Sequence, residues 1–136
     1  AAMQEADLII TITSSNAASL LADHVVAGCH ISAMGTDTIG KQEIDPALFA
    51  RAAVFTDEVA QSVTIGEAQH AVAQGLIARE DITPLGAVVT GTAKGRVSPD
   101  QITIFDGTGV GLQDLAVAQT ALSRARAQGL GAEVVF

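Results

Sequence analysis

Three short runs of apolar, mostly β-branched residues, each closed by a polar turn, constrain the fold of this chain most strongly. They occupy residues 8–13, 30–34 and 52–57, and a fourth strand-like run covers residues 102–106. Helical patterns lie between these runs, and strands that alternate with helices form βαβ units in a parallel sheet. The first run is apolar on both faces, so we predict a strand that is buried on both sides. The fold class expected from this pattern is α/β.

Several helices are predicted from capping residues and apolar periodicity. Pro46 begins a helix for which Asp45 is the N-cap, and residues 66–77 form another. The longest helix covers residues 112–128 and ends at Gly129. The remaining expectations are a polar break at residues 14–16, a connector at 81–86, a helix or strand at 87–90, and a strand at 132–136.

The composition of the chain excludes several classes of protein. Its 136 residues are 49% hydrophobic, enough for one buried core, which rules out a mainly disordered chain. No apolar run approaches the roughly 20 residues of a membrane helix, so we expect no membrane partner. A net charge of -8, with no Trp or Tyr, argues against a nucleic-acid partner. The single Cys29 excludes an internal disulfide and favours a reducing compartment such as the cytoplasm.

Polar residues follow each predicted strand at its carboxyl end, where open parallel sheets bind their ligands. If they converge at one edge, these residues would form a polar crevice in which a ligand can come close to the backbone. Backbone amides there could bind phosphate, ribose or nicotinamide oxygens. The same residue types are also common in ordinary turns, so both interpretations stay open. The residues concerned are Thr13 and Ser14, Met34 to Asp37, Thr56 and Asp57, and Asp106 to Gly109.

Asp37 is the sharpest candidate among these residues, because it follows Gly35 at a strand end. A carboxylate in the crevice would act as a general base or stabilise an iminium cation. The alternative is a helix N-cap or turn aspartate. The alternating glycines at 107, 109 and 111 do not match the GxGxxG dinucleotide loop. The three His residues have no ligand-like spacing, so we predict no metal site.

Five segments carry a resemblance to a known family. They are residues 6–13, 30–45, 66–70, 95–96 and 102–116, in the order that the family shows. The most specific are Gly-Thr-Asp-Thr-Ile-Gly-Lys-Gln-Glu-Ile-Asp at 35–45 and Phe-Asp-Gly-Thr-Gly at 105–109. On these residues the chain resembles the ornithine cyclodeaminase/mu-crystallin family. That family includes cyclodeaminases, an archaeal-type alanine dehydrogenase and cyclic imine reductases.

The resemblance implies a Rossmann domain that binds NAD or NADP. Asp37 matches the catalytic aspartate of the family, which lies beside the reacting amine or imine carbon of a small amino-acid or imine substrate. Asp37 and Thr108 are then also the substrate-binding residues. The family's cofactor contacts fall on Thr13, Met34, Gly35, Thr36, Lys41 and Gly107.

The resemblance also implies a carboxy-terminal portion of a longer protein. Residues 1–110 would be the second half of the Rossmann NAD(P)-binding domain. Residues 111–136 would be the helix and strand that return to the substrate and dimerisation domain. The amino-terminal half of such proteins supplies the GxGxxG loop, basic substrate-binding residues and most of a homodimer interface.

We therefore expect an NAD(P)-dependent amino-acid cyclodeaminase, dehydrogenase or imine reductase. It would move a hydride between nicotinamide and an amino-acid or cyclic-imine carbon, and the 136-residue chain alone would be inactive. The alternatives are a non-catalytic NAD(P)H-binding protein of the crystallin type and an inactive fragment.

Overall fold

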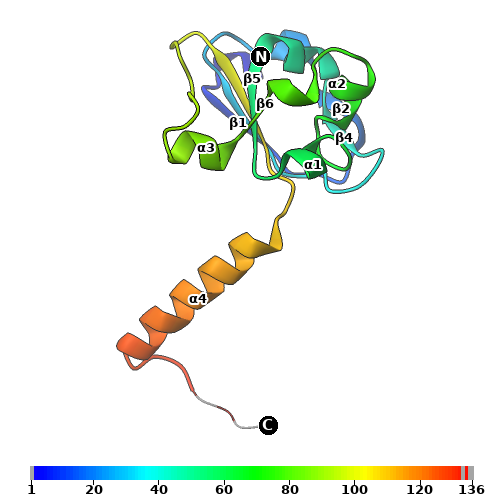
Figure 1. Cartoon of the computed structure of the whole chain (residues 1–136). Helices are drawn as coiled ribbons and strands as arrows, with labels where there is room; N and C mark the ends of the chain where they lie inside the picture. The colour runs from blue at the N-terminus through cyan, green and yellow to red at the C-terminus, as the bar shows by residue number, and fades with distance from the viewer. Residues whose placement is uncertain (1, 133, 135–136) are drawn as a thin grey trace.

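The computed structural model describes residues 2–132 and residue 134. Residues before about 110 form an α/β layer, and a long helix, α4 (Gly111–Ala127), leaves the sheet and extends away from it (Figure 1). The predicted helix at 112–128 is therefore confirmed. Gly129 follows it with a φ of +65°, a left-handed conformation that favours glycine and ends the helix.

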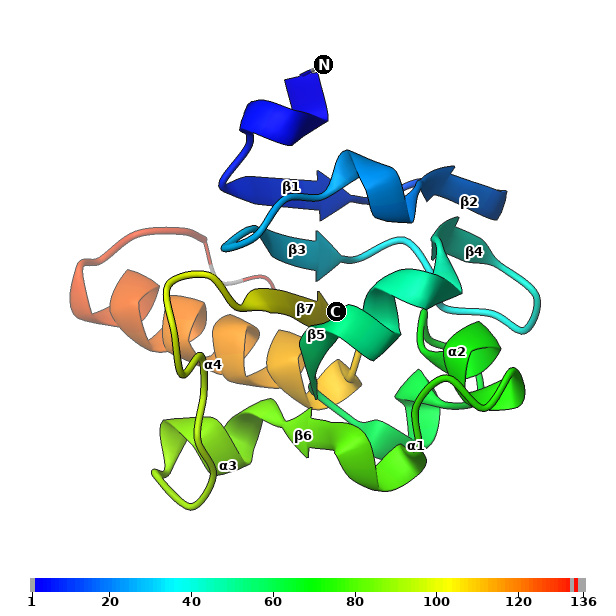
Figure 2. The same ribbon diagram turned by 90° about the horizontal axis from the view of Figure 1, so that it is seen from above.

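A five-stranded sheet organises the α/β layer, and every strand pair in it is parallel. Its spatial order is β1-β3-β7-β5-β6, so β7 lies between strands that come much earlier in the chain (Figure 2). The parallel α/β prediction is confirmed. The strands are β1 (Leu8–Thr11), β3 (His30–Ala33), β5 (Ala52–Thr56), β6 (Ile82–Pro84) and β7 (Ile102–Asp106).

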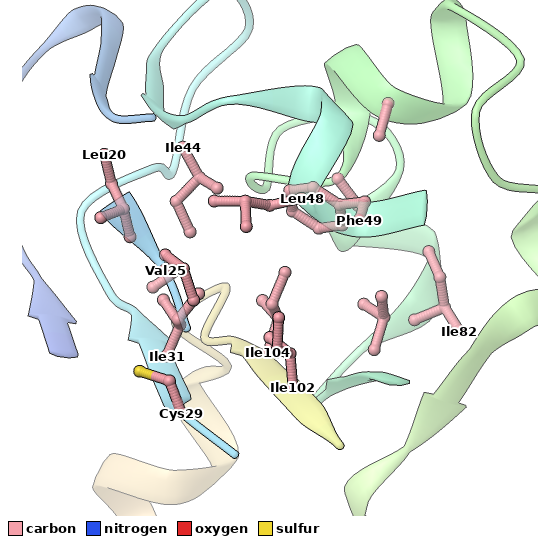
Figure 3. Close-up of a cluster of buried hydrophobic side chains, with 14 residues drawn as sticks. Leu20, Val25, Cys29, Ile31, Ile44, Leu48, Phe49, Ile82, Ile102 and Ile104 are labelled. Atoms are coloured by element: carbon pink, nitrogen blue, oxygen red, sulfur yellow. The ribbon is translucent and has the colours of Figure 1, made fainter. Parts of the chain in front are cut away.

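The hydrophobic core lies on one face of this sheet. The register places Ile31 of β3 and Val54 of β5 on either side of Ile104 in β7, and all three are buried. Figure 3 shows Leu48 and Phe49 above the Ile104 side chain. Both belong to the 3-10 helix η3 (Pro46–Arg51) and are almost completely inaccessible. The strands are therefore held together by burial of apolar side chains on this face.

Several short elements complete the layer, and some of them differ from expectation. The polar break at 14–16 runs into β2 (Asn16–Leu20), which pairs in parallel with β4 (Gln42–Ile44). The connector at 81–86 contains β6 and the start of a helix, α3 (Leu85–Val89), which includes all of the segment at 87–90 except Thr90. The predicted helix at 66–77 is reduced to α2 (Gln69–Ala73). The others are α1 (Val59–Ser62), η1 (Ala2–Glu5), η2 (Ala22–His24) and η4 (Arg79–Asp81).

The first strand contradicts the prediction of burial on both sides. β1 is an edge strand, and only its Ile9 packs against the core. Leu8 and Ile10 point to the other face and remain 55% and 61% exposed. Within the described part of the chain nothing covers that face of β1. The apolar pattern of a strand shows that both of its faces favour burial. Whether a face is buried depends on the segments that pack against it.

The carboxy-terminal segment differs from expectation as well. Residues 133, 135 and 136 of the predicted strand at 132–136 lie outside the described residues, and Ala132 and Val134 belong to no strand. In α4 no residue is buried, and Leu112, Leu115 and Val117 are at least 63% exposed. The helix is therefore formed without packing against the sheet.

Asp45 caps η3 as predicted, and its loss should cost stability. Its Oδ1 accepts a hydrogen bond from Ala47 N at 3.0 Å, and its Oδ2 accepts one from Ala22 N at 3.2 Å. We expect Asp45→Ala to lower the free energy of unfolding by about 1–2 kcal/mol, because two backbone amides lose their acceptor. Urea unfolding monitored by circular dichroism measures this. Asp100→Ala, at an exposed loop position, is the matched control and should leave the midpoint unchanged.

Candidate functional site

The carboxyl ends of four strands meet at one edge of the sheet. The register aligns the ends of β1, β3, β7 and β5, with Ala33 opposite both Thr11 and Asp106. Backbone bonds continue this alignment into the turns, because Met34 N donates to Thr11 O and Gly107 N donates to Ala33 O. The predicted site residues on the turns after β1, β3 and β7 are therefore brought together.

The Asp37 side chain lies on this edge and is 66% exposed. Lys41 Nζ lies 2.7 Å from its Oδ1, and Thr38 Oγ1 donates to the same oxygen at 3.0 Å. Hydrogen bonding from Lys41, followed by that from Thr38, holds the pKa of Asp37 below its ordinary value. No helix begins at Asp37, so it is not an N-cap, but it lies on the turn between β3 and β4, as the alternative of a turn aspartate also predicts. The residue is an accessible, ionised carboxylate.

Lys41 and Thr36 take positions that the sequence did not predict. The Lys41 ammonium group, expected to bind an anionic cofactor, is hydrogen-bonded to Asp37. The Thr36 side chain, expected to line the cofactor site, is 1% exposed and donates its hydroxyl hydrogen to Glu67. The Thr36 side chain therefore organises the turn and does not face the solvent.

Thr13 and Met34 are exposed, whereas Gly35 lies tightly against the turn after β1. A Cβ added to Gly35 would lie 2.5 Å from both N and O of Thr13. At Gly107 a Cβ would lie 2.6 Å from Met34 Sδ, so the turns after β3 and β7 are also in contact. The three turns form one continuous surface because small residues allow this close approach.

Gly35 should not tolerate a methyl group. We expect Gly35→Ala to destabilise the protein by about 1–3 kcal/mol, because backbone atoms of Thr13 would have to move. Thermal unfolding followed by calorimetry measures the loss. Gly111→Ala is the matched control, since Gly111 has nothing within 4 Å of the added Cβ and begins α4. Equal unfolding temperatures for Gly35→Ala and the wild type would contradict the expectation.

Thr108 is fixed by Asp57, a residue that follows β5. The Thr108 backbone N and its Oγ1 both donate to the Asp57 carboxylate, at 3.0 and 2.7 Å from Oδ1. Gln113 Nε2 donates to Oδ2 at 3.2 Å. Burial disfavours ionisation of Asp57, but hydrogen bonds from Thr108, Glu58 N and Thr56 together outweigh it, and the pKa of Asp57 is lowered. Thr108 is 4% exposed, so its hydroxyl serves mainly to hold the loop after β7.

Three carboxylates are buried beneath these turns. Sequence reasoning named Asp106 only as a strand-end candidate and assigned no role to Glu43 or Glu67. Glu43, Glu67 and Asp106 are each at most 1% exposed. Asp106 is the last residue of β7, and Glu43 lies between Gln42 and Ile44 in β4. Charged residues are almost never fully buried without hydrogen-bonding partners. The signal available in the sequence was the position of Asp106 directly after the apolar residues of a predicted strand.

The His side chains make separate hydrogen bonds and do not lie together in one site. His30 Nδ1 lies 2.7 Å from Thr103 Oγ1, and His70 Nε2 lies 2.9 Å from Lys41 O. Among the residues described, no group of three or more His, Cys, Asp or Glu side chains could hold a metal ion. In the same part of the chain, no helix combines the length and apolar character needed to cross a membrane.

The charge of this edge decides which part of a dinucleotide fits it. Two carboxylates, Asp37 and Asp57, lie on the turns, together with the Thr13 hydroxyl and exposed backbone at Gly109. Such groups suit ribose hydroxyls, a carboxamide or a protonated imine, and disfavour a pyrophosphate. The residues present therefore fit the nicotinamide end of a dinucleotide better than its pyrophosphate.

Comparison with known proteins settles the family. The model of the ornithine cyclodeaminase/mu-crystallin family matches residues 1–129. The chain belongs to this family. The resemblance stated from the residues is confirmed, and this member of the ornithine cyclodeaminase/mu-crystallin family carries its two specific runs on the turns after β3 and β7.

Two relatives show how the chain compares with proteins of known structure. The iminosuccinate reductase of Paracoccus denitrificans is 60% identical over 130 residues, which are 96% of this chain and 40% of that protein. Its crystal structure with NAD+ superimposes with a TM-score of 0.90 at 59% identity, covering 98% of this chain and 41% of that one.

The alanine dehydrogenase of Archaeoglobus fulgidus is 37% identical over 131 residues, covering 96% of this chain and 41% of that protein. A structure of an archaeal alanine dehydrogenase dimer with bound NAD superimposes with a TM-score of 0.86 at 37% identity, covering 96% and 41%. The chain spans about 40% of the length of the curated relatives it matches. Both solved relatives hold a nicotinamide dinucleotide, and the family includes oxidoreductases and cyclodeaminases.

Proposed function

We propose that this chain is the carboxy-terminal part of an NAD(P)-dependent oxidoreductase that acts on the carbon–nitrogen bond of a small imino or amino acid. The observation that carries the proposal is the accessible Asp37 carboxylate on the turn after β3, at the edge where the turns after β1 and β7 meet. The 60% identity to an iminosuccinate reductase makes an imino dicarboxylic acid the first substrate to consider.

Hydride transfer to a protonated imine is favoured by a negative group beside the reacting nitrogen. When bound, the nicotinamide supplies or accepts the hydride. A protonated imine carries positive charge on its nitrogen, and its carbon gains the hydride to give an amine. Asp37 is suited to bind that cationic nitrogen, because its lowered pKa keeps the carboxylate ionised at neutral pH. In this proposal Lys41 holds the Asp37 carboxylate in position through its bond to Oδ1.

The other predicted site residues receive separate roles in the proposal. Thr13, Met34, Gly35 and Gly107 line the cofactor, with Thr36 contributing backbone only. Thr108 lies at the substrate side, held by Asp57. Residues 1–110 are the second half of the Rossmann domain and 111–136 belong to the substrate and dimerisation domain. The unpacked α4 supports that division.

The test is an assay of the full-length gene product. Oxaloacetate with ammonium, which form iminosuccinate in solution, should oxidise NADH or NADPH. Pyruvate with ammonium is the competing imine in the same assay, and release of ammonium from ornithine in the presence of NAD+ tests cyclodeaminase activity. We expect turnover with the imino dicarboxylate to be fastest. Cofactor binding without turnover on any of these substrates would instead support a non-catalytic binding protein. The 136-residue chain alone should be inactive, because it contains no GxGxxG loop.

A further inference from the structure

The three buried carboxylates are linked in series. Each one accepts a hydrogen bond from the backbone N–H of the residue that bears the next carboxylate. Asp106 Oδ1 accepts from Glu67 N at 3.0 Å. Glu67 Oε1 accepts from Glu43 N at 2.7 Å and from Ile44 N at 2.6 Å. The series runs from the end of the inner strand β7 to β4, which lies beyond the carboxyl ends of β1 and β3 (Figure 2).

The last carboxylate, Glu43, joins the two turns that carry the proposed site. Its Oε1 accepts from Thr13 N, and its Oε2 accepts from Gly35 N at 3.1 Å. Thr13 follows β1 and Gly35 follows β3, so one side chain sets the spacing between the two turns. Asp37 is two residues beyond Gly35 and depends on the same turn.

We propose that Glu43 is a positioning residue of the site, which holds the turns after β1 and β3 at the separation required by the ligand, and that Glu67 holds Glu43 in place. This inference rests on the proposed function, because it concerns the same site. The Glu43 and Glu67 side chains do not touch the ligand and act through Thr13, Gly35 and Thr36.

The two glutamates should respond differently to amide substitution. Both oxygens of Glu43 accept from backbone N–H groups, which cannot reverse their direction. Glu43→Gln therefore sets an NH2 group against an N–H group and separates the turns. In Glu67 one oxygen accepts both backbone bonds, and the other accepts from the Thr36 hydroxyl. That hydroxyl can rotate and accept from an amide, so Glu67→Gln preserves every contact.

The experiment compares these variants in the full-length gene product. We expect Glu43→Gln to lower kcat/KM by about 10- to 100-fold, through a lower kcat and a higher KM for the cofactor, since small displacements of a site have effects of this size. Glu67→Gln should retain wild-type values, and Glu67→Ala should resemble Glu43→Gln. Glu80→Gln, at an exposed position, is the matched control.

Amide hydrogen exchange separates positioning from general stability. In Glu43→Gln we expect faster exchange at Thr13 and Gly35, with protection retained in β5 and β7. If that variant does not fold, Thr36→Val and Thr36→Ser replace it. The first removes the hydroxyl bound to Glu67 and should lower kcat, whereas the second keeps it.

Wild-type kcat/KM in Glu43→Gln, or an equal loss in Glu67→Gln, would overturn the positioning role. For the Thr36 pair, equal kcat values would do so. A wild-type protein with neither cofactor binding nor turnover would overturn the proposed function and the catalytic consequence together. Faster exchange at Thr13 and Gly35 alone would then still identify Glu43 as the tether between the turns.

Discussion

Replacing Asp37 by Asn should reduce turnover of the full-length protein by about 10²- to 10⁴-fold, the usual contribution of a positioned acid–base or charged group. Asn keeps the size of the side chain and its bond to Lys41, but it lacks the negative charge that stabilises a protonated imine. The side chain is 66% exposed, so the fold should not change. Steady-state oxidation of NADH with the preferred imine measures the loss, and circular dichroism checks the fold.

Asp100→Asn is the control for this substitution, because Asp100 is exposed before β7 at the opposite end of that strand. It should keep wild-type turnover. Cofactor affinity of Asp37→Asn, measured by NADH fluorescence, should change much less than kcat, since the carboxylate is assigned to the substrate nitrogen. Undiminished kcat in Asp37→Asn would remove Asp37 from the reaction.

The second large effect concerns stability and pH. Asp106 is fully buried, and burial raises its pKa from 3.8 to about 6 against the hydrogen bonds from Ser62, Glu67 N and Ala68 N. The neighbouring Glu67 carboxylate raises it as well. Folding therefore favours the protonated form of Asp106. The protonated carboxyl therefore contributes to the free energy of unfolding fully below about pH 4, and this contribution is lost as the pH rises through about 6.

The size of this contribution follows from the shift of roughly two pKa units, which corresponds to about 3 kcal/mol. Urea unfolding of the wild type and Asp106→Asn between pH 4 and 7 measures it. We expect the free energy of unfolding of the wild type to fall relative to that of Asp106→Asn progressively across this range, because Asn does not titrate. An advantage that grows with pH would show that the three hydrogen-bond donors outweigh burial.

Ser62→Ala provides a second variant for the same carboxyl. Ser62 Oγ donates to Asp106 Oδ2 at 2.6 Å, a bond that favours the ionised form. Its removal should raise the pKa of Asp106 further and move the loss of stability to higher pH. The remaining acceptor bonds to Glu67 N and Ala68 N stay in place.

Local sequence signals predicted the strands and the place of the candidate site. The β-branched runs that became β1, β3, β5 and β7 are short and closed by polar residues, so their type and parallel arrangement followed from pattern alone. Because parallel strands end at one edge, the place of Asp37 at that edge follows from its position after a strand. Asp45 capped its helix as expected, since N-capping depends only on neighbouring residues.

Long-range contacts could not be predicted in the same way. β6 and the β2–β4 pair lie in segments whose residues favour turns, and their strands exist because a partner offers hydrogen bonds. Thr36 and Lys41 look like ligand-facing residues in the sequence. The Thr36 hydroxyl binds Glu67, which only the folded chain brings within hydrogen-bonding distance, whereas the Lys41 ammonium group binds Asp37 within the same turn.

The sequence by itself determined the α/β class, the parallel sheet, the family and the turn that carries Asp37. Each of these depends on residue type and spacing within short segments. Only the tertiary structure decided that β1 lies at an exposed edge, and that Glu43, Glu67 and Asp106 join the strand ends from beneath. Burial and hydrogen bonding between distant segments depend on how those segments pack, and no local pattern contains that information.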